Sequence, residues 1–468
     1  MNFNYKKFAW AVLSCVVSTG SSAASFLASD LEKTRPSQPP LERWGEDYRF
    51  LSDSSKRTDR LDPYRYVEID DDNWLQFGAE ARYSAEAVKN PGYGLRGVDN
   101  DSYFLQRLQV HADGHLLNDS LRVFAQLQNT ESWGKDLVSV KDQNRTEFQQ
   151  AFADWNYYTD SGNKFYARYG RQEMEFGRGS LVSFRDSANV RTAFQGTRVG
   201  YSQSGFDISL FNVRPIVNDM KSFDDKPNSK VRFSGAYATL KPSQHWGLDL
   251  YVMELRTKER LWDAERGDEK RYTVGSRFFG EAGKIDWSYE FTRQTGHIGD
   301  ADISAWAVGG DIGYRLNTRP YLRLSLRTEV TSGDKQPRDG KAGTFDPMFG
   351  LNGYYGGAVV TQLSNIVLVG PELRFSPARN VIVLPGAFMI WKQSDEDGVY
   401  VPGMGVLPGS TQMDGRRVGT SYRARTRWLA SQNLTFDFDV QYFDVSRAMH
   451  DIGADDVSYA ALRTTFRF

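Results

Sequence analysis

The chain has 468 residues, too many for one minimal core and suited either to several soluble domains or to one large barrel. Its formal net charge of -1 favours neither nucleic acid nor an acidic partner, so we expect no nucleic-acid ligand. The mean hydropathy is -0.55 although aromatic residues make up 14%, which suits a water-filled barrel because only alternate strand residues face lipid.

The chain begins with the pattern of a secretory signal peptide. Two lysines precede an apolar stretch over residues 8–17, and residues 21–23 are small enough for cleavage. We expect a signal peptide over residues 1–24, with a structural N-terminal helix as the alternative. The apolar stretch is too short for a membrane-spanning helix, which needs ~20 residues, and no other run approaches that length.

The only cysteine, Cys15, lies within the expected signal peptide. The mature chain is therefore expected to have no disulfide, no cysteine metal ligand and no thiol nucleophile. Lipidation of Cys15 is an alternative that the very short apolar run before it disfavours.

Residues 25–72 are polar and irregular, with four prolines and no strand pattern. We expect them to form either a periplasmic tail or a segment that fills the lumen of a barrel. The pattern changes at Trp74, where apolar and polar side chains begin to alternate in runs of ten to fifteen residues separated by turn residues. The alternation continues to the last residue and defines a second region, residues 73–468.

The alternation predicts eighteen strands. It is clearest at 321–332, where Leu322, Leu324 and Leu326 fall on one face and polar side chains on the other. The strands are expected near residues 74–88, 102–115, 121–132, 148–158, 164–172, 197–203, 206–213, 230–241, 247–258, 270–281, 285–297, 304–315, 321–332, 359–376, 381–393, 419–429, 434–447 and 457–468.

The lengths of the connections separate a barrel from a soluble sandwich. Short connections such as 204–205 and 282–284 alternate with long ones such as 173–196 and 333–358. Outer-membrane barrels have short periplasmic turns and long extracellular loops, whereas a sandwich has no reason to alternate them. We therefore predict an all-β fold, a transmembrane antiparallel up-and-down barrel of about eighteen strands in the outer membrane of a Gram-negative bacterium.

The predicted barrel implies several partners. Its outer face would contact outer-membrane lipid and lipopolysaccharide. The chain ends in Phe468, and a terminal aromatic residue on an amphipathic last strand resembles the signal read by the barrel-insertion machinery.

Arginine is prominent on the polar face of the predicted strands. A guanidinium is always charged and its fork matches a carboxylate, so rows of arginine in a pore suit an anionic solute such as a uronic-acid polymer or a small organic acid. The alternative is structural, because arginine can brace the wall by pairing with aspartate and glutamate on neighbouring strands. The predicted inward arginines are Arg107, Arg122, Arg168, Arg198, Arg277, Arg323, Arg327, Arg423, Arg425, Arg427, Arg463 and Arg467.

Enzymatic and metal-dependent functions have little support in the sequence. None of the five histidines has a nucleophile motif nearby, so we predict a protein that is not an enzyme and that uses no cofactor. The aspartate-rich stretches at 70–72 and 395–397 would suit calcium, but such stretches are more often solvated turns, and no metal site is predicted.

Two regions resemble the alginate export family of outer-membrane porins, and the resemblance extends from about residue 44 to the end of the chain. The first comprises Gly170-Arg171-Gln172-Glu173, Phe176-Gly177, Leu181-Val182-Ser183, Asn189-Val190-Arg191, Phe194, Gly196 and Arg198. The second comprises Ser332-Gly333-Asp334, Asp339-Gly340, Gly343-Thr344-Phe345-Asp346-Pro347-Met348-Phe349 and Tyr354-Tyr355-Gly356. The chain resembles the wider group of diffusion porins in this family more than the dedicated alginate exporter.

The resemblance implies a monomeric barrel of eighteen strands, an arginine-lined pathway for a negatively charged polysaccharide, and loops that regulate passage. It implies that Arg171, Arg191 and Arg198 line the pathway. Strict alternation would turn Arg171 toward lipid, so its assignment requires a bulge near Gly170. A long loop at the pore mouth would contain Asp334, Asp339, Lys341 and Asp346.

The sequence therefore predicts an outer-membrane channel that passes anionic sugars, oligosaccharides or acidic polysaccharide. A general small-solute porin with bracing arginines is the first alternative, and a surface adhesion or receptor barrel with a plugged lumen is the second. The solute, the direction of transport, and a plugging role for residues 25–72 or 333–358 stay open.

Overall fold

The structure is a computed structural model that describes residues 39–468 except residues 263–264, 352–356 and 359. The expected signal peptide and the Tyr354-Tyr355-Gly356 motif lie outside the described residues. Within the described part of the chain, no helix is long and apolar enough to cross a membrane.

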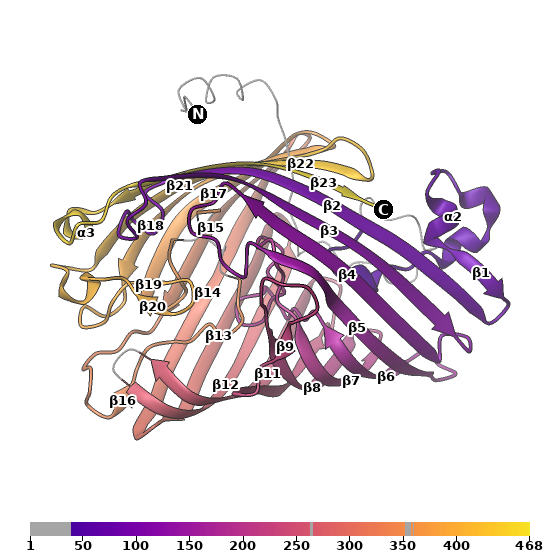
Figure 1. The fold of residues 1–468 in the computed structure, drawn as a ribbon, viewed down its shortest axis with the longest axis horizontal. Coiled ribbons are helices and arrows are strands. Elements are labelled where there is room, and N and C mark those ends of the chain that lie inside the picture. The colour runs from indigo at the N-terminus through magenta and orange to yellow at the C-terminus, as the bar shows by residue number, and fades with distance from the viewer. Residues whose placement is uncertain (1–38, 263–264, 352–356, 359) are drawn as a thin grey trace.

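Eighteen long antiparallel strands form a closed barrel (Figure 1). The first barrel strand pairs with the last, from Glu80 opposite Arg467 to Lys89 opposite Ser458, so the sheet has no free edge. The strands are β2 (Asn73–Lys89), β3 (Asn100–Leu116), β4 (Leu121–Trp133), β5 (Asn144–Tyr158), β6 (Lys164–Gln172), β7 (Phe194–Gln203), β8 (Phe206–Val217), β10 (Val231–Leu240), β11 (Trp246–Trp262), β12 (Glu265–Ala282), β13 (Ile285–Ile298), β14 (Ala301–Thr318), β15 (Tyr321–Thr331), β17 (Ile366–Ala378), β18 (Val381–Lys392), β21 (Arg417–Leu429), β22 (Leu434–Val445) and β23 (Val457–Arg467).

The predicted fold is confirmed, and each predicted strand corresponds to one strand of the barrel. Some boundaries were wrong. β17 begins at Ile366, seven residues after the predicted start at 359, because residues 360–365 belong to a loop. β5 begins at Asn144, before the predicted 148, because a bulge at Gln149 interrupts the alternation by which the strand was recognised.

The two ends of the barrel differ in their connections. At the short-turn end, turns such as residues 204–205 and 283–284 join the strands, and the C-terminus lies there (Figure 1). At the long-loop end lie longer connections such as 393–416, which includes β19 (Tyr400–Val401), β20 (Gly405–Val406) and η4 (Ser410–Gln412). α3 (Arg447–Asp451) and the short strands β9 (Lys226–Pro227) and β16 (Lys341–Ala342) also belong to loops of this end.

Two long connections fold inward and meet inside the barrel. The first inner loop is residues 173–193, between β6 and β7, and the second is the described part of residues 332–365, between β15 and β17. Phe349 N donates to the carbonyl of Leu181 at 2.9 Å, and Ser183 N donates to the carbonyl of Phe349 at 3.1 Å. Gly350 permits this approach, because a Cβ there would lie 1.9 Å from the carbonyl oxygen of Ser180.

An apolar cluster fixes the inner loops against one side of the barrel. Leu181 and Val182 of the first loop and Phe345 of the second are buried among inward side chains of β7, β8, β10, β11 and β14. Burial of such side chains stabilises the fold by roughly 1.5–3 kcal/mol each. The far end of the second loop packs on the opposite side, where Val360 and Leu363 join an apolar cluster with β17, β18, β21 and β22.

The N-terminal segment, residues 39–48, lies against the inner wall. Tyr48 N donates to Gln76 Oε1 of β2 at 2.9 Å, and Arg43 donates to the carbonyls of Ala79 and of the terminal Phe468. Nearer the start of the segment, the carbonyl of Leu41 accepts a hydrogen bond from Arg191 of the first inner loop at 3.1 Å. The segment thus runs from the short-turn end up to that loop.

Residues 43–70 contain short elements that the irregular sequence did not predict. They are η1 (Arg43–Gly45), η2 (Arg49–Ser52), η3 (Ser54–Lys56), α2 (Asp62–Arg65) and β1 (Val67–Asp70). The expectation of no strand in residues 25–72 was wrong, because β1 forms a hairpin with β2. Tyr48, Leu51, Tyr66 and Trp74 form the small apolar core of this region.

Candidate channel lining

The predicted inward arginines of the strands all occupy positions that face the lumen in the observed register. On β21, Arg423, Arg425 and Arg427 alternate with outward side chains such as Tyr422 and Trp428. The same alternation turns inward Arg107, Arg122, Arg168, Arg198, Arg277, Arg323, Arg327, Arg463 and Arg467.

Most of these arginines contact a carboxylate on a neighbouring strand. Arg168 pairs with Asp154 through two hydrogen bonds of 2.7 and 2.8 Å and lies over the ring of Trp44, in the N-terminal segment. Arg198 instead donates to Ser209 Oγ at 2.7 Å. Further cross-strand pairs include Arg122 with Asp113, Arg277 with Asp249, Arg323 with Asp286 and Asp311, Arg423 with Glu372, Arg427 with Asp437, and Arg463 with Glu86.

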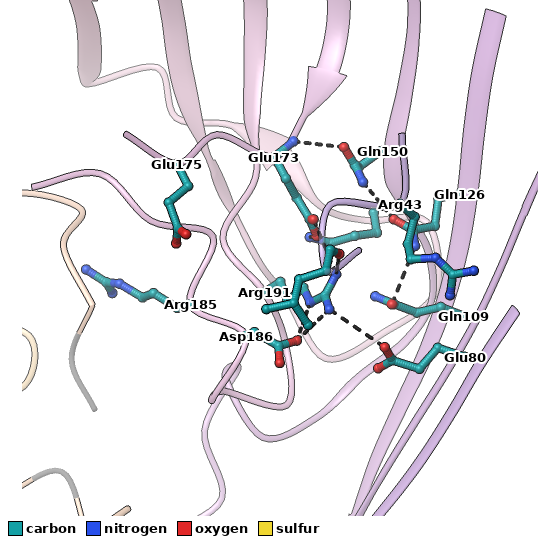
Figure 2. Close-up of polar contacts among 12 residues, drawn as sticks. Arg43, Glu80, Gln109, Gln126, Gln150, Glu173, Glu175, Arg185, Asp186 and Arg191 are labelled. Carbon is teal, nitrogen blue, oxygen red and sulfur yellow. Dashed lines mark hydrogen bonds and ion pairs between the residues drawn. The ribbon is translucent and has the colours of Figure 1, made fainter. Parts of the chain in front are cut away.

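A buried ion cluster lies where the first inner loop meets β2 and β3. Glu80 accepts hydrogen bonds from Arg107 at 2.9 Å and from Arg467 at 2.6 Å. Figure 2 shows Arg191 between Asp186 and Glu80. The Glu80–Asp186 cluster contains four guanidiniums and three carboxylates, from Arg82, Arg107, Arg191, Arg467, Glu80, Glu173 and Asp186.

Electrostatics keep the carboxylate of the first inner loop charged. Burial alone would raise the pKa of Asp186, but Arg82, Arg191 and Arg107 outweigh it and hold that pKa well below its usual range. Asp186 therefore stays ionised and attaches the loop to β2 and β3.

A second group of carboxylates in the lumen behaves differently. Burial, together with the nearby charge of Glu175, raises the pKa of Glu42 in the N-terminal segment to about 7. Burial also raises the pKa of Glu175. The contact between the segment and the first inner loop thus includes Glu42, an acid that titrates near neutral pH.

The wall of β2, β17 and β21–β23 has more cations than anions on its inward face. Arg425 is well exposed, since 40% of its side chain is accessible while it pairs with Asp439 at 3.0 Å. Seven inward guanidiniums accompany five inward carboxylates, namely Arg82, Arg374, Arg423, Arg425, Arg427, Arg463 and Arg467 with Glu80, Glu86, Glu372, Asp437 and Asp439.

The family of the chain follows from its sequence as a whole. The family model described as alginate export matches residues 73–462, which is most of the barrel. The chain belongs to the alginate export family. No curated protein sequence matches it.

Solved porin structures share the fold of this alginate export family member. Pseudomonas aeruginosa OpdO matches with a TM-score of 0.57 at 12% identity, covering 84% of this chain and 97% of that one. Acinetobacter baumannii OccAB1 matches with a TM-score of 0.56 at 10% identity, covering 86% and 98%. Pseudomonas aeruginosa OccK2 (OpdF) in complex with glucuronate matches with a TM-score of 0.56 at 9% identity, covering 84% and 96%. The chain is therefore an outer-membrane channel.

One family-based assignment is wrong for this porin. Arg171 faces outward on β6, because the register runs without a shift through Gly170 and no bulge turns the side chain inward. Arg171 instead donates to the carbonyls of Phe148 and Asp225 and pairs with Glu147 at 3.3 Å. The bulge lies one strand away, on β5.

The predicted pore-mouth residues separate into two groups. Asp339 and Lys341 are exposed at the long-loop end. Asp334 donates its backbone N–H to Asp397 at 2.9 Å and so connects two loops. Asp346 belongs to the same loop but is buried against the wall near the long-loop end of β11, where Arg260 contacts it at 3.2 Å.

Neither aspartate-rich stretch forms a group with metal-ligand spacing among the described residues; the group that does is Glu147, Asp224 and Asp225. Asp70 caps a turn by accepting from Asp72 N at 3.0 Å. Asp397 accepts a hydrogen bond of 2.6 Å from the hydroxyl of Thr344, at a buried contact between two loops.

Sequence reasoning missed several inward cations. Arg82 falls on the alternating polar face of its strand, so the period of two residues is a signal that would have found it. Arg185 has no such signal, because it lies in the first inner loop with φ 56°, where it donates to the carbonyl of Gly350 at 2.8 Å. Arg43 likewise lies outside any periodic pattern.

Proposed function

We propose that this channel passes anionic solutes that carry carboxylates, above all uronate sugars and their oligosaccharides. One chain closes the whole barrel, so we propose that it functions as a monomer. The observation that carries the proposal is the excess of guanidiniums over carboxylates on the wall of β2, β17 and β21–β23, where Arg425, Arg427 and Arg463 keep part of their side chains exposed.

The exposure of the arginines supports solute contact at this wall. Arg425, Arg427 and Arg463 expose 40%, 22% and 22% of their side chains, whereas Arg107 is fully buried. An exposed guanidinium retains hydrogen-bond donors for a passing carboxylate, even while one side of it contacts an aspartate. Weak and repeated contacts of this kind let a solute move on instead of binding tightly.

A uronate in a porin of the same fold also supports the proposal. OccK2 was solved in complex with glucuronate, a sugar that carries one carboxylate. Identity at 9% carries over the fold alone, so the solute class comes to this chain only through its own arginines.

A general small-solute porin is the second candidate. It is favoured by the carboxylate partners of most inward arginines, because a paired arginine braces the wall and adds little net charge to the lumen. Under this candidate, neutral and acidic sugars of equal size should pass at similar rates.

Block of single-channel current by uronate oligomers separates the two candidates. We expect Arg425→Gln to weaken the block about fivefold, because it removes one charged contact at an exposed position. The matched variant Asp439→Asn should strengthen the block, since it removes the competing carboxylate. The double variant should lie close to the wild type.

Neutral oligosaccharides of the same length serve as the reference solute. They should block all variants equally under the proposed function. Equal block of the wild type by uronate and neutral oligomers, with no response to either substitution, would establish the general porin instead. Heat-modifiable migration in gels confirms that each variant has folded.

A further inference from the structure

Three arginines form a row on the outward face of the barrel, away from the channel. Arg214, Arg232 and Arg256 lie on the neighbouring strands β8, β10 and β11. Arg232 is directly opposite Arg256, and Arg214 is the next residue after the pair of Val213 with Phe233. Their chain neighbours Val213, Phe233 and Leu255 are buried inside the barrel, so the three arginines point outward.

The row has little compensating charge. Arg256 contacts Glu254 at 2.6 Å, but Arg232 donates to the neutral Asn212 at 2.8 Å. Arg214 makes only long contacts, of 3.4 and 3.5 Å, with backbone carbonyls of residues 228–229. Like charges directly opposite each other on neighbouring strands destabilise a sheet. A bound anion would remove this repulsion.

The row lies at the height of the outer membrane interface. Leu210, Ala236 and Val252 form an apolar row nearer the short-turn end, and the next outward residues, Asn212, Ser234 and Glu254, are polar. Eight to ten residues separate the arginines from the short-turn ends of β10 and β11, which corresponds to about 20–26 Å along the membrane normal for tilted strands. The apolar band of such barrels is about 25 Å tall.

This height explains why the charges are tolerated on a lipid-facing surface. The cost of an outward arginine is largest at the midplane and falls toward the interface. Because long loops face the cell exterior in outer-membrane barrels, the row faces the outer leaflet. Lys270 continues it on β12, opposite Arg256.

We propose that Arg214, Arg232 and Arg256 bind a phosphate group of lipopolysaccharide in the outer leaflet. A guanidinium fork fits two phosphate oxygens, and adjacent strands hold the three forks side by side. Lipid A carries its phosphates at the level of the headgroups, where the row lies. The site is independent of the channel and of the solute that passes through it.

Binding of bisphosphorylated lipid A to the detergent-solubilised full barrel tests the site, with native mass spectrometry as the readout. The double variant Arg214→Gln/Arg232→Gln should bind lipid A about tenfold more weakly than the wild type. The matched control is Arg293→Gln, an exposed outward arginine on β13 outside the row, which should leave binding unchanged.

Ligand variants complete the experiment and do not depend on any substitution. The wild type should bind lipid A without phosphates about tenfold more weakly, and excess inorganic phosphate should compete with lipid A. Equal affinity for lipid A with and without phosphates, equal affinity of the double variant and the wild type, or equal binding of phosphatidylglycerol would each overturn the proposal. Heat-modifiable migration verifies that the variants are folded.

Discussion

At the scale of single residues, the inward arginines differ in how far carboxylates enclose them. Arg107 and Arg467 share Glu80 in a fully buried contact, and Arg425 meets Asp439 at an exposed position. A buried guanidinium that loses its carboxylate is left as an uncompensated charge, whereas an exposed one is solvated by water. The same residue type therefore braces the wall in one place and remains accessible to solute in another.

Glu80→Gln tests the bracing role. The substitution removes the carboxylate of Arg467 and leaves the buried Arg107 with Asp186 alone, so the free energy of unfolding should fall by about 3 kcal/mol. Urea unfolding followed by the loss of heat-modifiable migration measures this change. The exposed pair of Arg315 with Glu281 provides the control, because Glu281→Gln should cost less than about 1 kcal/mol. Equal costs for the two variants would contradict the bracing role.

At the scale of elements, the N-terminal segment and the first inner loop form one assembly inside the lumen. Arg191 of the loop donates to the carbonyl of Leu41, and Trp44 of the segment covers Arg168 of the wall. Arg191 thus donates to a backbone carbonyl and Arg168 stacks on an aromatic ring of the protein itself, so neither contact is open to a solute. Release of this segment would expose further cations to the lumen.

Docking of the N-terminal segment should weaken as the pH rises. The docked state raises the pKa of Glu42 from an ordinary 4.5 to about 7, so it favours the protonated form. The resulting stabilisation is complete below the ordinary pKa and is lost as the pH passes through about 7. The charges facing Glu42 are Glu175, Glu173, Arg198 and Arg168.

Hydrogen exchange of the backbone amides of residues 41–48 measures this docking. After correction for the intrinsic rates, protection in the wild type should fall between pH 6 and pH 8. Glu42→Gln cannot ionise, so its protection should stay nearly constant over this range. The same pH profile in both proteins would show that Glu42 does not control the docking.

At the scale of the whole molecule, the sequence was sufficient for the barrel and insufficient for its interior. Residues such as Leu322 and Leu324 carry the period of two that predicts strands, and turn lengths order the strands around the barrel. The inner loops carry no such period, so their packing through Val182 and Phe349 was not predictable. Their path depends on contacts between residues far apart in the chain.

The arginines that line the lumen could also be predicted only in part. Inward positions such as Arg423 were predictable from alternation along one strand, but their partners depend on the register between strands, which a single strand does not specify. Arg171 shows the limit of a family motif, because the register of β6 is unbroken and the bulge lies on β5, so the side chain keeps the outward orientation that strict alternation gives. Exposure to the lumen also depends on where the inner loops pack.

The zero-current potential of the open wild-type channel tests the proposed function most directly. In a planar bilayer with a steep potassium chloride gradient, the excess of guanidiniums on the wall of β2, β17 and β21–β23 should give the potential the sign of chloride permeation. Replacing chloride by glucuronate should preserve that sign. A potential with the sign of potassium permeation in both salts would contradict an anion channel.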